Sequence, residues 1–111
     1  MINIVKDYSL AEALNIIINA DSNDIELIPH AIQKSNQRNV NLEYIEKCII
    51  EKDLLGLIKT RSNRFKIIYP HETKKSRDLY IVIEIDENIG KLIVITIYTT
   101  SINRRLREHE I

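Results

Sequence analysis

Glycine, cysteine and histidine are scarce in this chain of 111 residues, and their scarcity excludes several kinds of site. Gly56 and Gly90 are its two glycines, so it has neither a glycine-rich phosphate loop nor a dinucleotide-binding fingerprint. One cysteine and three scattered histidines cannot form a zinc site of local spacing. A nucleophile elbow is also missing. We therefore expect no metal ion, no cofactor and no hydrolase triad.

The single cysteine and the short apolar segments indicate a cellular setting. Cys48 cannot form an internal disulfide, and its place on the apolar side of a predicted helix suggests a small buried residue. The N-terminus has no signal-peptide pattern, and no apolar run reaches the ~18 residues of a membrane span. These features predict a cytoplasmic protein without a membrane partner.

Composition and charge predict one globular domain, residues 1–111, with two electrically different halves. The chain is 44% hydrophobic and 29% charged, and its 16 basic and 16 acidic residues balance. Residues 1–58 carry five Lys/Arg against nine Asp/Glu, which gives −4, and residues 59–111 carry eleven against seven, which gives +4. The second half thus suits an anionic partner and the first a cationic one. A chance partition of surface charge is the alternative.

Helical signals fill the first half. Ser9 and Glu12 have the spacing of a capping box, which predicts a helix over residues 9–19. Pro29 suits the first position of a second helix, which would run to about Gln37. Asn39 can then close that helix in the left-handed conformation.

A third helix is predicted over residues 42–53, with Asn41 as its N-cap. Its expected apolar stripe consists of Leu42, Ile45, Ile49 and Ile50. Between the first two helices, residues 21–24 form a polar turn. Residues 25–28 fit either a short extended piece or the entry to a helix.

From residue 54 the apolar spacing changes from helical to alternating, which predicts strands. The expected strands are residues 55–60, 64–69, 79–86 and 91–100, of which the last is apolar on both faces, as a central strand is. Pro70 ends the second of them, and the charged residues 101–111 fray or form a short helix. The predicted fold is α+β, with N-terminal helices packed on a four-stranded, mainly antiparallel sheet.

Basic and aromatic residues gather around this predicted sheet. They are Lys59, Arg61, Arg64 and Lys66 on one hairpin, Arg104, Arg105 and Arg107 after the last strand, and the rings of Tyr80 and Tyr98. Cations beside exposed rings suit single-stranded nucleic acid, with charge for phosphate and rings for base stacking. Cations that stabilise a phosphorane also suit metal-free RNA cleavage. A solvated sheet face with a basic tail is the alternative.

Of the three histidines, His30 has two interpretations and the other two have one each. His30 falls in the first turn of the middle helix, where it is either a neutral base or, the more common case, a structural histidine packed under the sheet. We expect His71, in the loop after Pro70, to be exposed, and His109 to lie in the tail.

The order of these pieces resembles a known family. The chain has His30-Ala31, then Arg38 and Val40, then a predicted helix and strands that end with residues 93–98. This order is similar to that of a family of uncharacterised small prokaryotic domains, which have a His-Ala…Arg helix before an antiparallel sheet. That family is in turn similar to the RelE/BrnT-like toxins of type II toxin–antitoxin systems, whose arginine-rich ending resembles residues 99–108. The resemblance covers residues 25–108, so residues 1–24 would be an added N-terminal helix. Asn39 and Pro29 depart from the family pattern, which commonly has Gly and Ser there.

The resemblance implies a RelE-like fold and a metal-independent endoribonuclease that acts on mRNA and is neutralised by a small antitoxin protein. Arg64, Lys66 and Arg104 would hold phosphates, and Tyr98 or His30 would transfer protons or stack on a base. The alternative is a non-catalytic module of the same fold that binds a protein or a nucleic acid. The oligomeric state is left open.

Overall fold

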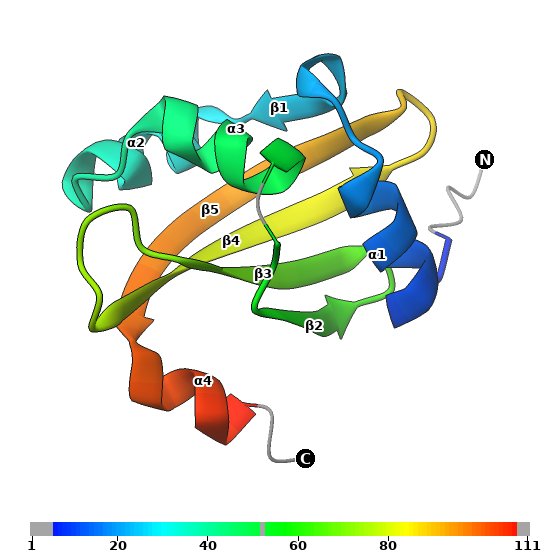
Figure 1. Ribbon diagram of the computed structural model, residues 1–111. Helices are drawn as coiled ribbons and strands as arrows, with labels where there is room; N and C mark the ends of the chain where they lie inside the picture. The colour runs from blue at the N-terminus through cyan, green and yellow to red at the C-terminus, as the bar shows by residue number, and fades with distance from the viewer. Residues whose placement is uncertain (1–5, 52, 109–111) are drawn as a thin grey trace.

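Helices cover one face of a mixed sheet in this chain (Figure 1). The computed structural model describes residues 6–51 and 53–108, with the side chains of 106–108 left out. The predicted α+β class is confirmed. The sheet has five strands rather than the four expected, in the order β1-β5-β4-β3-β2.

The N-terminal helix α1 (Leu10–Ile18) begins where the capping box predicts. The Ser9 hydroxyl accepts a hydrogen bond from the Glu12 backbone N–H at 3.1 Å, and the Glu12 carboxylate accepts one from the Ser9 N–H at 3.0 Å. Its inner face buries Ala13 and Ile17. Residues 22–24, expected as a polar turn, form the short 3₁₀ helix η1 (Ser22–Asp24).

The ambiguous segment before Pro29 is an extended one. It forms β1 (Ile25–Leu27), which pairs in parallel with β5, Glu26 lying opposite Ile93. β1 is the fifth strand of the sheet, which the sequence prediction missed. A three-residue strand has too little alternation to be recognised before its partner is known.

Two further helices follow β1 and form a short hairpin. α2 (Pro29–Gln37) has Pro29 at its first position, and Asn39 ends it with a φ of 55°, as predicted. α3 (Leu42–Glu51) is capped at its N-terminus by Asn41, whose side-chain oxygen accepts a hydrogen bond from the Glu43 N–H at 3.1 Å.

The predicted apolar stripe of α3 is partly wrong. Ile45 and Ile49 are buried as expected, but Leu42 and Ile50 are 38% and 37% exposed. The buried face instead includes Tyr44 and Cys48. The stripe is therefore turned, because the phenol ring of Tyr44 enters the core while its hydroxyl donates a hydrogen bond to the Pro70 carbonyl at 2.6 Å.

The remaining strands form an antiparallel meander. They are β2 (Gly56–Arg61), β3 (Arg64–Pro70), β4 (Arg77–Asp86) and β5 (Lys91–Ser101). A bulge between β4 and β5 lets Val94 and Ile97 both lie in the core. The chain ends in α4 (Ile102–Glu108), which continues directly from β5. His109 and the side chain of Arg107 lie outside the described residues.

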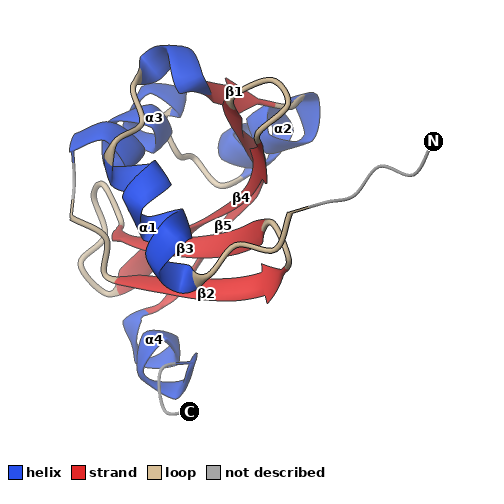
Figure 2. Ribbon diagram, turned by 90° about the vertical axis from the view of Figure 1, so that its right-hand side faces the viewer, coloured by secondary structure: helices blue, strands red, loops and turns tan. Residues whose placement is uncertain are grey.

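The two faces of the sheet are unlike. The face toward α1, α2 and α3 is built from alternate residues such as Phe65, Ile67, Ile81 and Ile83, all 0% exposed, and belongs to the main hydrophobic cluster. We call the opposite side the second face. Helix α4 lies on that side, away from the other three helices (Figures 1 and 2). No described helix is long and apolar enough to cross a membrane.

Candidate nucleic-acid interface on the second face of the sheet

Two stacked tyrosine rings and a lysine lie together on the second face. Tyr80 on β4 lies directly opposite Tyr98 on β5, and their rings stack with centroids 4.9 Å apart and planes at 27°. The Lys66 ammonium on β3 lies 5.7 Å from the centroid of the Tyr98 ring, which is within cation–π range. Tyr80 is fully buried and Tyr98 is half-buried, so Tyr98 is the ring that a ligand could reach.

Arg64 lies on the same face, two residues before Lys66 on β3. It is opposite Glu84 on β4, and its guanidinium lies 3.2 Å from the Glu84 carboxylate. The two side chains are 26% and 31% exposed, so the pair is partly solvated. The Arg64 Nε is buried and has no hydrogen-bond partner among the described residues. Because the side chain is 26% exposed, its terminal nitrogens are the donors that an incoming phosphate could reach.

At the other end of the sheet, two arginines bind the strands themselves. Arg77 lies on the helix-covered face, in alternation with Asp78, and donates a hydrogen bond to the Thr99 carbonyl at 2.9 Å. The Arg105 Nε on α4 lies 3.1 Å from Asp78 Oδ2, and Asp78 is only 2% exposed. Burial raises the pKa of the Asp78 carboxyl, and the Arg105 charge opposes that rise. This ion pair ties α4 to the start of β4.

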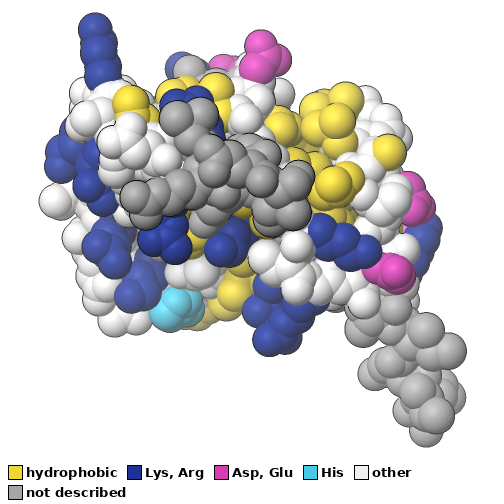
Figure 3. Space-filling model, turned by 90° about the horizontal axis from the view of Figure 1, so that it is seen from below, with side chains coloured by type: hydrophobic (Ala, Val, Ile, Leu, Met, Phe, Trp, Pro, Cys, Tyr) yellow, Lys and Arg dark blue, Asp and Glu magenta, His cyan; other side chains and the backbone are white. Residues whose placement is uncertain are grey.

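Of the five candidate residues predicted from the sequence, four lie on the same side of the sheet and one does not. Arg64, Lys66 and Tyr98 share the second face, and Arg104 stands exposed on α4, which lies on the same side of the sheet. Seen from that side, Lys and Arg side chains are spread across the surface, whereas Asp and Glu side chains lie toward its edges (Figure 3).

His30 does not belong to this group. It is exposed in the first turn of α2, in the helical layer on the other side of the sheet. The expectation of a histidine packed under the sheet is wrong. With Pro29 at the first helical position, the face of α2 that turns inward carries Ala31 and Ser35, and His30 points away from it.

His71, expected to be exposed, is half-buried in the loop after β3. Its Nδ1 accepts hydrogen bonds from the backbone N–H groups of Thr73 at 3.1 Å and Lys74 at 3.0 Å. Burial lowers the pKa of this imidazole, and the charges of Lys74 and Arg77 lower it further. The ring therefore holds the loop in place as a neutral acceptor.

One residue of the face was not singled out from the sequence. Glu84 is the counter-ion of Arg64. Alternation along β4 puts Glu84 on the same side as Tyr80, but only the register between β3 and β4 shows that it meets Arg64.

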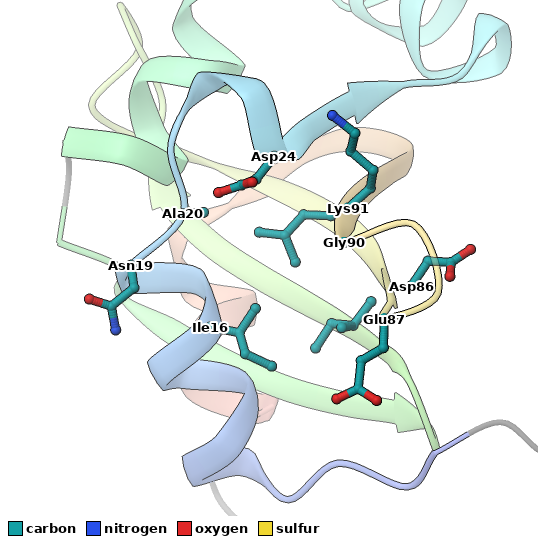
Figure 4. A pocket seen from close by; sticks show the side chains of 10 residues that line it. Ile16, Asn19, Ala20, Asp24, Asp86, Glu87, Gly90 and Lys91 are labelled. Atoms are coloured by element: carbon teal, nitrogen blue, oxygen red, sulfur yellow. The ribbon is translucent and has the colours of Figure 1, made fainter.

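A separate cavity of about 300 Å³ lies between the end of α1, η1 and the β4–β5 turn. Ile16, Ile85 and Leu92 form its apolar floor. Asp24 and Glu87 stand on opposite sides of this floor (Figure 4). Its carboxylates repel phosphate, and none of the five candidate residues lines it, so the interface that fits an anionic strand is the second face.

Among the described residues, no group of three or more His, Cys, Asp or Glu side chains could hold a metal ion. No family model, curated protein or solved structure matches this chain.

Proposed function

We propose that this protein binds single-stranded RNA on the second face and cleaves it without a metal ion, as a toxin of the type II toxin–antitoxin kind. The observation that carries the proposal is the Lys66 ammonium over the Tyr98 ring, beside Arg64. The ring offers a stacking surface for one base and the two cations offer charge for phosphates. The resemblance of residues 25–108 to RelE/BrnT-like toxins supports the same function.

The chemistry proposed is transesterification within the RNA. The 2′-hydroxyl loses its proton to water and attacks the adjacent phosphorus, and the bond from phosphorus to the 5′-oxygen breaks. Tyr98 donates its phenolic proton to the leaving 5′-oxygen and regains it from solvent. Lys66, which lies over the Tyr98 ring, would stabilise the extra negative charge on the phosphorane, and Arg64 and Arg104 would hold phosphates farther along the strand.

A second candidate, binding without cleavage, has its own support. His30, which could have been a base, lies in the opposite layer. Glu84 is four residues from Tyr80 along β4, so it stands roughly 13 Å from the Tyr98 row at ~3.3 Å per residue. One phosphate cannot contact a base and an acid that far apart, because proton transfer needs hydrogen-bond distance.

Two assays on the purified protein separate these candidates. Fluorescence anisotropy with a labelled 20-nucleotide single-stranded RNA measures binding, and a gel of a long RNA incubated in EDTA measures cleavage. We expect Lys66→Ala to weaken binding about tenfold. Lys47→Ala, a matched change on the exposed side of α3, should leave it unchanged.

Variants of Tyr98 then distinguish its two proposed roles, base stacking and proton transfer. Tyr98→Phe keeps the ring, so it should bind RNA normally and lose cleavage, whereas Tyr98→Leu should lose both. Binding that persists with intact RNA in the wild type supports the non-catalytic module. If the folded protein binds no RNA at low salt, both candidates fail.

A further inference from the structure

Helix α1 leaves part of its apolar stripe exposed, beside the row that the core buries. Leu10, Leu14 and Ile18 are 49%, 38% and 61% exposed, and their spacing of four residues puts them in one row. Ala13 and Ile17 form the neighbouring row, which is buried in the core. The core therefore covers only part of the apolar stripe of α1, and three exposed aliphatic side chains in a row beside it are informative.

This outer row leads into a groove between the ends of α1 and α3. Ile18 and Ile50 both line the groove, whose volume is about 150 Å³ and whose wall includes Tyr69. Ile50 is itself 37% exposed. The α1 row and the groove are therefore continuous at Ile18, and together we call them the α1 surface.

The charge at the groove end of the α1 surface is mainly acidic. Glu51 and Asp53 line the groove, and α3 also presents Glu43 on its exposed side. Helix α1 contains no Lys or Arg, and Lys47 is the basic residue that α3 contributes. An apolar row with an acidic border complements an apolar row with a basic border.

We propose that the α1 surface docks an amphipathic helix of a protein partner, whose apolar stripe is flanked by Lys or Arg. Helices bind in this way through residues spaced three and four apart. The row from Leu10 to Ile18 is about 12 Å long at 1.5 Å per residue, so with the groove it accommodates a helix of roughly three to four turns. This inference does not depend on RNA binding.

Charge also selects this occupant over two others. A second copy of the chain in a two-fold interface would present the same acidic border, so Glu51 and Asp53 of the two copies would repel. An anionic lipid surface would be repelled by the same carboxylates. A basic helix is the occupant that the apolar and charged groups favour together.

The test uses the full chain and two synthetic 18-residue helical peptides. Both carry leucines at helical spacing, with lysines flanking the stripe in one peptide and glutamates in the other. Titration calorimetry at low salt should give a micromolar dissociation constant for the lysine peptide and at least tenfold weaker binding for the glutamate peptide.

Two variants locate the site. Ile18→Lys should weaken binding of the lysine peptide at least tenfold, and its positive charge at the C-terminal end of α1 is compatible with the helix dipole. Leu14→Gln, an uncharged change, should weaken binding severalfold. Ile89→Lys, at a 55% exposed position in the β4–β5 turn, is the matched control and should bind like the wild type. Circular dichroism checks that each variant is folded.

Three results would overturn the proposal. They are equal affinity for the two peptides, unchanged affinity in folded Ile18→Lys, and a dimer of the wild type that Ile18→Lys dissociates, since a second copy would then occupy the surface. RNA affinity, measured on the same Ile18→Lys sample, should remain at the wild-type value. Loss of peptide binding and loss of RNA binding are therefore separate outcomes.

Discussion

The ion pair between Asp78 and Arg105 allows a quantitative test of how α4 is held. Arg105→Ala would leave a carboxylate that is 2% exposed without its cation. Breaking a fully buried pair costs about 3–5 kcal/mol. Arg105 is 29% exposed, so the pair is partly solvated and we expect a loss of about 2 kcal/mol in the free energy of unfolding.

The complementary variant should cost much less. Asp78→Asn removes the buried charge and keeps the side-chain shape, while Arg105 can turn toward water, so the expected loss is below ~1 kcal/mol. In the Asp78→Asn background, Arg105→Ala should then cost only about 0.5 kcal/mol, which is typical of an exposed side chain. The coupling energy of the double-mutant cycle is therefore about 1.5 kcal/mol.

Urea unfolding followed by circular dichroism measures this cycle. For a slope of about 2 kcal/mol per molar urea, Arg105→Ala should lower the midpoint by about 1 M. The pH dependence has a defined sign. Because burial raises the pKa of Asp78 in the folded protein, its ionised form is destabilising above that pKa, and the destabilisation is relieved as pH falls toward the ordinary value of 3.8.

The loss of unfolding free energy caused by Arg105→Ala should therefore become smaller as the pH is lowered from 7 toward 4. In the Asp78→Asn background this loss should not change with pH. If Arg105→Ala costs the same in both backgrounds at every pH, the ion pair contributes nothing to the stability of α4 and the reasoning is refuted.

Four other predictions concern single sites. Phe65→Ala, in the fully buried row of β3, should cost about 3–5 kcal/mol in urea unfolding, and a loss below ~1 kcal/mol would show that the core is not packed there. Asn39→Ala should cost about 1 kcal/mol because φ is 55°, whereas Asn39→Gly should be nearly neutral in the same assay. Ser9→Ala should cost about 1 kcal/mol through loss of the capping box, and an unchanged midpoint would contradict that role. NMR titration of His71 should give a pKa below 6.5; because the unfolded chain then binds the proton more readily, His71 lowers stability as the pH falls through that region.

Local signals explain the parts of the fold that were predicted correctly. The capping box at Ser9, the proline that starts α2 and the left-handed Asn39 each depend on neighbours within a few residues. Alternation along β4 is equally local. Pairing between distant segments is not, which is why the parallel pairing of β1 with β5 was missed.

The same distinction explains the candidate site. Alternation puts Arg64 and Lys66 on one face of β3, and the sequence shows this directly. Register brings Tyr98 under Lys66 and Glu84 beside Arg64, and register depends on turns and bulges that composition does not reveal. His30 was misplaced because a residue in the first turn of a helix can face either way until the packing of that helix is known.

The pairing of β1 with β5 also determines when the protein can fold. Residues 25–27 pair with residues 92–94, which are far along the sequence. During synthesis, the helical first half is complete long before the strand that it packs against exists, and a contact so distant in sequence closes slowly. Strand β1 therefore cannot join the sheet until residues 92–94 have left the ribosome.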